Sequence, residues 1–209
     1  AVKGGRLARA AAPATVATLV VSDVIGDPLD AIASGPTVPD PTTYADALAV
    51  LDRYDLDAPA SVRERLRAGA AGELGETPTA GDPAFDRARA FVVGNGRTAL
   101  DAAADAAAEL GYEPLVLAAG VRGEARGAGA THAAIAEECA ARGSPAGPPA
   151  VLLSGGETTV TLGDADGRGG PNAEFAASAG LALAEGPLGA SDGGESAAPR
   201  VVVASADTD

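Results

Sequence analysis

Two glycine-rich loops that lie close together constrain this chain more than any other feature of its sequence. They are Ser154–Thr161 (SGGETTVT) and Gly167–Phe175 (GRGGPNAEF). The first pattern predicts a strand, a tight turn and a second strand, and the second predicts a loop that opens a helix. Glycine lets peptide N–H groups approach anionic oxygens closely, and a helix start adds positive partial charge. The pair predicts an anion site in an α/β domain, with two plain turns as the alternative.

These two loops resemble the signature of the class II glycerate 2-kinases, whose C-terminal part is called the MOFRL domain. Two further blocks match that family in the same order, Ser22–Pro41 (SDVIGDPLDAIASGPTVPDP) and Ala1–Ala8 (AVKGGRLA). The last residues, Ala206–Asp209 (ADTD), are similar to the start of the family's TDG.DG block. The resemblance covers nearly the whole chain and is weakest at residues 56–90 and 184–199.

Apolar, β-branched stretches alternate with helix-like stretches along the chain, which predicts an α/β fold with a largely parallel sheet. We expect strands at 15–21, 89–93, 113–118, 150–153, 158–162 and 200–204, and helices at 43–54, 60–68, 96–110, within 123–142 and at 172–184. The resemblance implies a three-layer, Rossmann-like sheet with helices on both faces, plus part of a second α/β domain. The expected domains are 1–142, the C-terminal part of a Rossmann-like glycerate kinase domain, a linker at 143–149, and a truncated MOFRL domain at 150–209.

Composition excludes several classes of function. The formal net charge is −14, from 29 acidic and 15 basic residues, and such a surface disfavours nucleic acid and anionic membranes. No run approaches the ~18 apolar residues of a membrane helix. One cysteine and one histidine allow neither an internal disulfide nor a zinc cluster, so we expect a cytoplasmic protein. The acidic, lysine-poor composition fits either a salt-loaded (halophilic) cytoplasm or a high-GC genome. The chain has no methionine and stops inside an apparent motif, which predicts an internal fragment.

The Ser22–Pro41 block begins at the carboxyl end of an expected strand, where ligands collect in open α/β sheets. Asp23 has the oxygen ligands that Mg²⁺ prefers. Hydroxyl and amide groups at Ser34 and Gly35 have the donors that an anion requires. The alternative is a rigid, proline-rich loop whose acidic side chains make turn hydrogen bonds. The resemblance favours substrate binding for Ser34 and Gly35.

Three shorter segments carry weaker signals. Lys3 is the only lysine of the chain and is followed by two glycines. Its flexible ammonium suits a moving phosphoryl charge, although an exposed basic turn is the alternative. The turn at Asn95 and Gly96 resembles a dinucleotide-binding loop that lacks its third glycine. It predicts either a contact with a nucleotide or a plain turn that caps a helix. The glycine-rich stretch 120–129 predicts a hinge or a lid without a catalytic role.

The resemblance implies ATP-dependent phosphorylation of the C2 hydroxyl of D-glycerate, with Mg²⁺. It implies that Lys3 and Arg168 stabilise phosphoryl oxygens and that an acid among Glu157, Asp207 and Asp209 accepts the hydroxyl proton or holds the metal. Asp23 and Asp207 are the candidate metal ligands. The candidate phosphate and substrate ligands in the two glycine loops are Ser154, Gly155, Gly156, Gly169, Gly170, Asn172 and Glu174.

The sequence departs from the family pattern in one loop, because Pro171 and Ala173 stand where the family often has Arg and Gln. The family's N-terminal catalytic lysine is expected upstream of Ala1, so we expect residues 1–209 alone to be inactive. Two other functions remain open: an NAD(P)H-dependent hydroxypyruvate reductase, and a non-catalytic module that binds an anion or a nucleotide. A homodimer is one assembly that the sequence allows.

Overall fold

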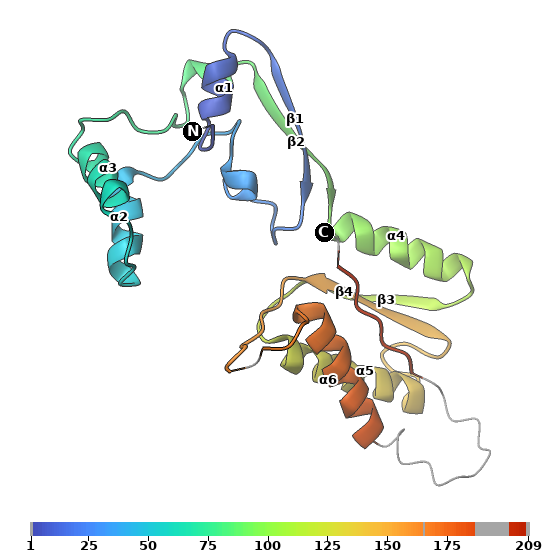
Figure 1. Ribbon diagram of the computed structural model, residues 1–209. Helices are drawn as coiled ribbons and strands as arrows, with labels where there is room; N and C mark the ends of the chain where they lie inside the picture. The colour runs from blue at the N-terminus through green and yellow to red at the C-terminus, as the bar shows by residue number, and fades with distance from the viewer. Residues whose placement is uncertain (1, 165, 187–200, 208–209) are drawn as a thin grey trace. The chain divides into compact units, whose positions relative to one another are not determined.

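A computed structural model describes residues 2–164, 166–186 and 201–207 (Figure 1). The described residues fall into two compact units. Unit 1 lies within Ala1–Val21 and Asp27–Val93, and unit 2 lies within Ser22–Gly26 and Gly94–Asp209. No helix among the described residues combines the length and the apolar character needed to cross a bilayer.

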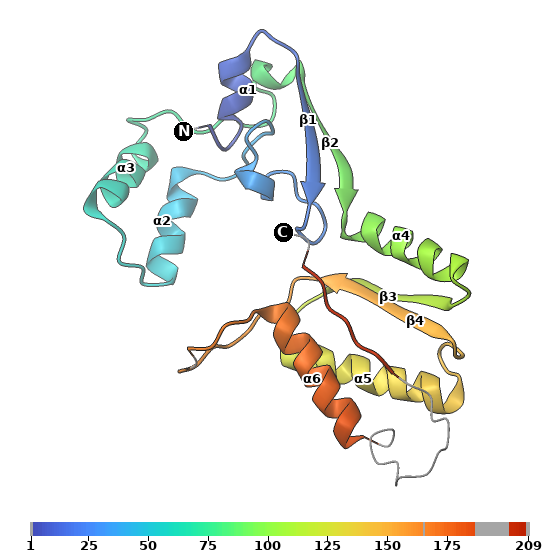
Figure 2. The same cartoon turned by 45° about the vertical axis from the view of Figure 1, so that its right-hand side comes forward.

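The strands of unit 1 follow the expected positions. β1 (Val16–Ser22) and β2 (Ala88–Asn95) are hydrogen-bonded neighbours, and their arrows run in the same direction in Figure 2. Both strands are rich in valine and other apolar residues that suit a pleated surface. A short helix that was not expected, α1 (Arg6–Ala11), precedes β1. Its alanine and arginine residues have high helix propensity. A segment of only six residues that contains two arginines gives too short a pattern to predict a helix.

The loops of unit 1 contain two helices and two 3₁₀ turns. Helix α2 (Tyr44–Arg53) begins at a capping box, because the Thr43 side chain accepts from the Asp46 N–H and the Asp46 carboxylate accepts from the Thr43 N–H. Helix α3 (Ala60–Ala70) follows it, and the expected helices at 43–54 and 60–68 are therefore confirmed. The 3₁₀ turns are η1 (Ile32–Ser34) and η2 (Pro83–Phe85).

Unit 2 has three layers. Strands β3 (Glu113–Val121) and β4 (Ala150–Gly156) pair in parallel, from Glu113 opposite Ala150 to Val121 opposite Gly156. Helix α4 (Gly96–Glu109) lies on one side of them in both views, and α5 (Ala125–Arg142) and α6 (Pro171–Glu185) lie on the other (Figures 1 and 2). The expected α/β fold with parallel strands is confirmed.

Small residues form the contact between α5 and α6. Ala125, Ala133 and Ala179 are buried, as is the single cysteine, Cys139. A Cβ atom at Gly129 would lie 2.4 Å from the Phe175 carbonyl oxygen, so the two helix backbones touch where α5 has no side chain. A chain with 3% aromatic residues fills this layer by bringing backbones close instead of by using bulky side chains.

Two expected strands are wrong. Residues 158–162 form no strand, because their hydrogen bonds go to the loop after β3 and to a side chain instead of to a continuous ladder. Residues 201–204 belong to a segment without strand hydrogen bonding, and Val202 is 87% exposed. A β-branched run has strand propensity, but a strand requires a neighbour to pair with. Arg200, the first residue of that expected strand, lies outside the described residues.

Residues 143–149 connect α5 to β4. The expected division of the chain into domains at this linker remains a prediction.

Candidate functional site

The carboxyl ends of β3 and β4 lie at one edge of unit 2, because the two strands are parallel. At this edge a Cβ atom on Gly156 would lie 2.1 Å from the Val121 carbonyl oxygen, so only glycine fits there. The next residue, Glu157, donates its backbone N–H to the same Val121 oxygen over 2.9 Å. Close strand packing therefore accounts for Gly156, and the Glu157 amide is not free to bind an anion.

Glu124 holds the segment that follows Glu157. One carboxylate oxygen accepts from the hydroxyls of Thr159 and Thr161 at 3.2 and 3.0 Å, and the other accepts from the Thr161 N–H at 3.2 Å. Backbone bonds reinforce the contact, since Thr159 donates to Gly123 and accepts from Ala125. The loop after β4 is thus tied to the start of α5.

The start of α6 has the features of an anion site. Gly170 is the N-cap and supplies no side-chain cap, and Pro171 fills the first helical position. The N–H groups of Asn172 and Ala173 donate to no described residue, whereas Glu174 donates to the Gly170 carbonyl. Unpaired N–H groups at a helix start point outward and attract anions through hydrogen bonds and the helix dipole.

Charged and polar side chains surround this helix start. Arg168 is exposed and has no ion pair or hydrogen bond within the described part of the chain. Glu174 instead binds Arg126 of α5, with 3.1 Å between Nε and Oε1. The Asn172 amide oxygen accepts from the Ser205 hydroxyl, which brings the segment that carries Asp207 to α6. Among the described residues at this helix start, the Arg168 side chain and the amides of Asn172 and Ala173 therefore remain for a ligand.

In unit 1 the two sequence blocks meet through their backbones. Gly4 donates to the Ser34 carbonyl over 2.8 Å and Gly5 donates to the Gly35 carbonyl over 2.7 Å. The N–H groups of Ser34 and Gly35 donate in turn to Ala31 and Ile32. Ser34 has a φ of 60°, a left-handed conformation that is strained for a residue with a side chain and that concentrates at functional sites. Its exposed hydroxyl remains open to a ligand.

Lys3 lies beside this junction in the sequence. It is exposed, and its side chain forms no ion pair or hydrogen bond with the residues that the structure describes, although its carbonyl accepts from the Arg6 N–H. Asp40 lies against the neighbouring glycine, since a Cβ on Gly4 would approach its carboxylate to 2.7 Å. Burial raises the pKa of Asp40, but hydrogen bonds from the Thr42 hydroxyl and N–H and the charge of Arg6 outweigh it and hold the pKa below its usual value.

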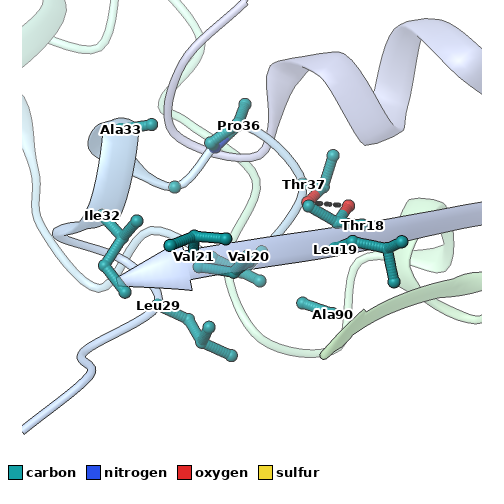
Figure 3. Close-up of a pocket in the computed structure, with 12 residues that line it drawn as sticks. Thr18, Leu19, Val20, Val21, Leu29, Ile32, Ala33, Pro36, Thr37 and Ala90 are labelled. Atoms are coloured by element: carbon teal, nitrogen blue, oxygen red, sulfur yellow. Dashed lines mark hydrogen bonds between the residues drawn. The ribbon is translucent and has the colours of Figure 1, made fainter. Parts of the chain in front are cut away.

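A hollow of about 200 Å³ lies in unit 1 between β1 and the turn that follows η1 (Figure 3). Among its lining residues only Thr18 and Thr37 carry side-chain oxygens, and these two hydroxyls bond to each other at 2.7 Å. The remaining lining is apolar. Gly35 lines the hollow, but no charged side chain does, so this space does not provide the charge that a phosphate or carboxylate requires.

The structure places the other predicted ligands as follows. Asn95 caps α4, because its side-chain oxygen accepts from the N–H and the hydroxyl of Thr98. Gly96 begins that helix. No three acidic, histidine or cysteine side chains of the described residues gather as a metal site, so Asp23 and Asp207 remain predictions. Asp209 lies outside the described residues.

Sequence reasoning missed the residues that hold the loops in place, which are Glu124, Arg126, Thr159, Thr161 and Ser205. The stretch 120–129 was expected to be a hinge or a lid, yet its acidic and basic side chains fasten the next loop and α6. One signal was present: Thr159 and Thr161 are two residues apart, so in an extended segment both side chains point to the same side.

Comparison with known proteins identifies the chain's relatives. Residues 1–67 match a family model described as a domain of unknown function, DUF4147, and residues 150–209 match the MOFRL family model. A protein from Pyrococcus horikoshii named glycerate 2-kinase is 43% identical over 180 residues, which are 85% of this chain and 40% of that protein. Residues 150–209 therefore belong to the MOFRL family.

Two further relatives of this chain carry different names. One from Agrobacterium vitis, provisionally named a hydroxypyruvate reductase, is 50% identical over 184 residues, which are 88% of this chain and 40% of that protein. A crystal structure of glycerate kinase from Thermotoga maritima superposes with a TM-score of 0.72 at 40% identity. The superposition covers 87% of this chain and 41% of the Thermotoga maritima chain. The chain therefore spans about two fifths of the length of these relatives.

Proposed function

We propose that the whole protein is a glycerate 2-kinase that transfers the γ-phosphoryl group of ATP to the C2 hydroxyl of D-glycerate. The observation that carries this proposal is the start of α6. Within the described part of the chain, the N–H groups of Asn172 and Ala173 have no partner, and neither does the side chain of Arg168, four and five residues before them. The names of relatives at 40–43% identity support the choice of glycerate.

Phosphoryl transfer requires positioning and charge neutralisation more than covalent catalysis. The C2 oxygen of glycerate would form a bond to the γ-phosphorus as the bond to the β,γ-bridging oxygen breaks, and ADP would leave. Arg168 and the α6 amides would bind the oxygens of the transferring phosphoryl group. The Lys3 ammonium would stabilise the negative charge on these oxygens during the transfer. The hydroxyl proton would pass to a carboxylate, for which Glu157, Asp207 and Asp209 are the candidates.

Glycerate itself carries a carboxylate that needs a separate set of donors. The Ser34 hydroxyl and the glycines at 155 and 169 are the candidates for it. We expect Mg²⁺ to be required, since it would neutralise the charge of the nucleotide phosphates and commonly takes only one or two protein carboxylates. Asp23 and Asp207 are proposed for that role, and the described residues form no closed metal cage.

Product identity tests the reaction. Incubation of the whole protein with ATP, Mg²⁺ and D-glycerate should give 2-phosphoglycerate, seen by phosphorus NMR. A 3-phosphoglycerate product, or undiminished turnover in excess chelator, would contradict the proposal.

Replacement of Arg168 tests the site. Arg168→Ala should lower kcat/KM by about 100-fold, which corresponds to about 2.7 kcal/mol of transition-state stabilisation, and Arg168→Lys should recover little because the planar fork is lost. Arg142→Ala is the matched control, since Arg142 is exposed at the end of α5 and pairs only with Glu138 in the described residues. An Arg168→Ala variant within threefold of wild type would show that the loop is a turn only.

A second candidate is an NAD(P)H-dependent hydroxypyruvate reductase, which the name of the Agrobacterium vitis relative favours. The turn at Asn95 lacks the third glycine of a dinucleotide loop, and its side chain is used as a helix cap. NADH oxidation that depends on hydroxypyruvate would select the reductase. A protein that binds ATP or glycerate without either turnover would be the non-catalytic module.

The acidic composition supports a cytoplasmic protein adapted to high salt. Self-repulsion among 29 acidic residues weakens as salt screens it. The melting temperature should rise as KCl increases from ~0.1 M to ~1 M, where the Debye length falls to ~3 Å. A flat melting temperature would leave genome composition as the explanation.

A further inference from the structure

Glu124 lies at the start of α5, but its side chain does not cap that helix. It is the N-cap residue, and its side chain makes no capping hydrogen bond. Glutamate is also not among the residues preferred at this position, which are Ser, Thr, Asp and Asn. Its carboxylate instead accepts three hydrogen bonds from Thr159 and Thr161, 35 and 37 residues further along the chain.

The segment that Glu124 holds is long and has little support of its own. Between the end of β4 at Gly156 and the start of α6 at Pro171, the described residues contain no helix or strand beyond one bridge, between Thr159 and Glu124. Loops of this length without their own secondary structure are uncommon and often functional. Hydrogen bonds to an ionised acceptor are the stronger class, so Glu124 is the principal side-chain anchor of the loop.

The position of this anchor relates it to the proposed chemistry. Thr159 is two residues after Glu157, the candidate proton acceptor, and the same loop continues to Arg168. The Glu157 amide is fixed from the other side by Val121. Glu157 therefore lies in a short stretch that is tied at both ends, by the β3 backbone before it and by Glu124 after it.

We propose that Glu124 is a positioning residue that fixes the Glu157–Thr161 stretch for phosphoryl transfer. The role rests on the proposed glycerate 2-kinase function. Glu124 touches neither substrate nor nucleotide in this role. It acts by holding Thr159 and Thr161, so its loss should affect the geometry of the reacting state more than substrate affinity, because small displacements of a positioned group reduce the rate strongly.

The kinetic test uses the whole protein with Glu124→Gln, Thr161→Val and their double variant. Gln keeps the size of the side chain but replaces one acceptor oxygen with a donor. We expect kcat to fall about tenfold in each single variant while KM for glycerate stays within about twofold. The double variant should be no slower than the slower single variant, because the two changes break one interaction. Glu138→Gln, on an exposed face of the same helix, is the matched control and should not change kcat.

Hydrogen exchange of the loop separates the anchor from the reaction. Backbone amides of residues 157–163 should exchange faster in Glu124→Gln than in wild type and in Glu138→Gln, whether or not the protein phosphorylates glycerate. Unchanged exchange would overturn the anchor. Faster exchange would still overturn the positioning role if the kinetic losses of the two single variants are additive, or if KM rises while kcat stays constant. Faster exchange in a protein that shows no glycerate kinase activity would overturn both the positioning role and the proposed function.

Discussion

The two units use glycine-rich loops in opposite ways. In unit 1, Gly4 and Gly5 donate to the Ser34 and Gly35 carbonyls, so the loops satisfy each other through their backbones. In unit 2, side chains at the start of α5 hold the loop after β4 and the first turn of α6, and the Asn172 and Ala173 amides donate to none of the described residues. The difference shows that glycine content alone does not predict an anion site. What matters is whether the protein itself already uses the N–H groups.

The largest effect should come from Gly156→Ala. A Cβ atom there would lie 2.1 Å from the Val121 carbonyl oxygen and 2.4 Å from its nitrogen, so β3 and β4 would have to separate at the edge that carries the site. We expect a loss of about 3 kcal/mol or more in the free energy of unfolding, measured by urea denaturation.

Gly180→Ala is the control for that change. Gly180 lies inside α6, and a Cβ atom there meets no other atom within 4 Å. Alanine should leave stability unchanged or raise it by up to about 1 kcal/mol through its helix propensity. Equal effects at positions 156 and 180 would remove the argument that close strand approach explains the first glycine.

The corresponding change in unit 1 is Gly5→Ala. Gly5 has a φ of 72°, and a Cβ atom would lie 2.8 Å from the Val38 carbonyl oxygen and 2.7 Å from the Phe85 ring. We expect a loss of about 2 kcal/mol, less than at Gly156 because the Phe85 side chain can move. If Gly5→Ala leaves the melting temperature unchanged, the loop-to-loop junction of unit 1 is not structural, and the contrast between the units fails.

Helix caps should give similar, smaller effects in both units. Thr43→Ala removes the capping box of α2 in unit 1, and Asn95→Ala removes the cap of α4 in unit 2. Each should cost about 1 kcal/mol in unfolding experiments. A much larger effect of Asn95→Ala on nucleotide affinity than on stability would show that this turn binds a ligand in addition to capping its helix.

The smallest of these effects should be the loss of stability of unit 1 in acid, through protonation of Asp40. The folded pKa of Asp40 lies below the usual value of an aspartate, so its contribution to stability is present above that usual pKa and is lost as the pH falls through the folded pKa. Asp40→Asn should therefore lose less stability than wild type between about pH 5 and about pH 2, by less than about 1 kcal/mol because the group is partly exposed. Parallel stability curves for the two proteins would contradict this.

Local patterns predicted most of the regular structure. The Thr43 capping signal, the β-branched run before Ser22 and the alanine-rich stretch after Gly96 all form the expected elements. The threonine-rich segment 158–162 did not form a strand, because its partner is the side chain of Glu124. A contact across 35 residues depends on how β3 and β4 pair, which no local pattern contains.

The candidate site remains a prediction. At the start of α6, the Asn172 and Ala173 amides and the Arg168 side chain have no partner among the described residues, which is compatible with an anion-binding loop. Gly156 was expected to cradle a phosphate, yet its geometry is explained by its approach to Val121. Glu174 was expected to bind substrate, but it forms an ion pair with Arg126. Glycine and charged residues have both structural and ligand-binding uses, and only three-dimensional neighbours distinguish them.

The backbone contact between Gly129 and Phe175 limits how α5 and α6 can move against each other. Because α5 and α6 touch without an intervening side chain, neither helix can slide along the other unless the pair first separates. The starts of both helices, and the charges near them, therefore travel as one rigid body. Arg126 and Glu174, which pair across these helix starts, are therefore held at a constant separation.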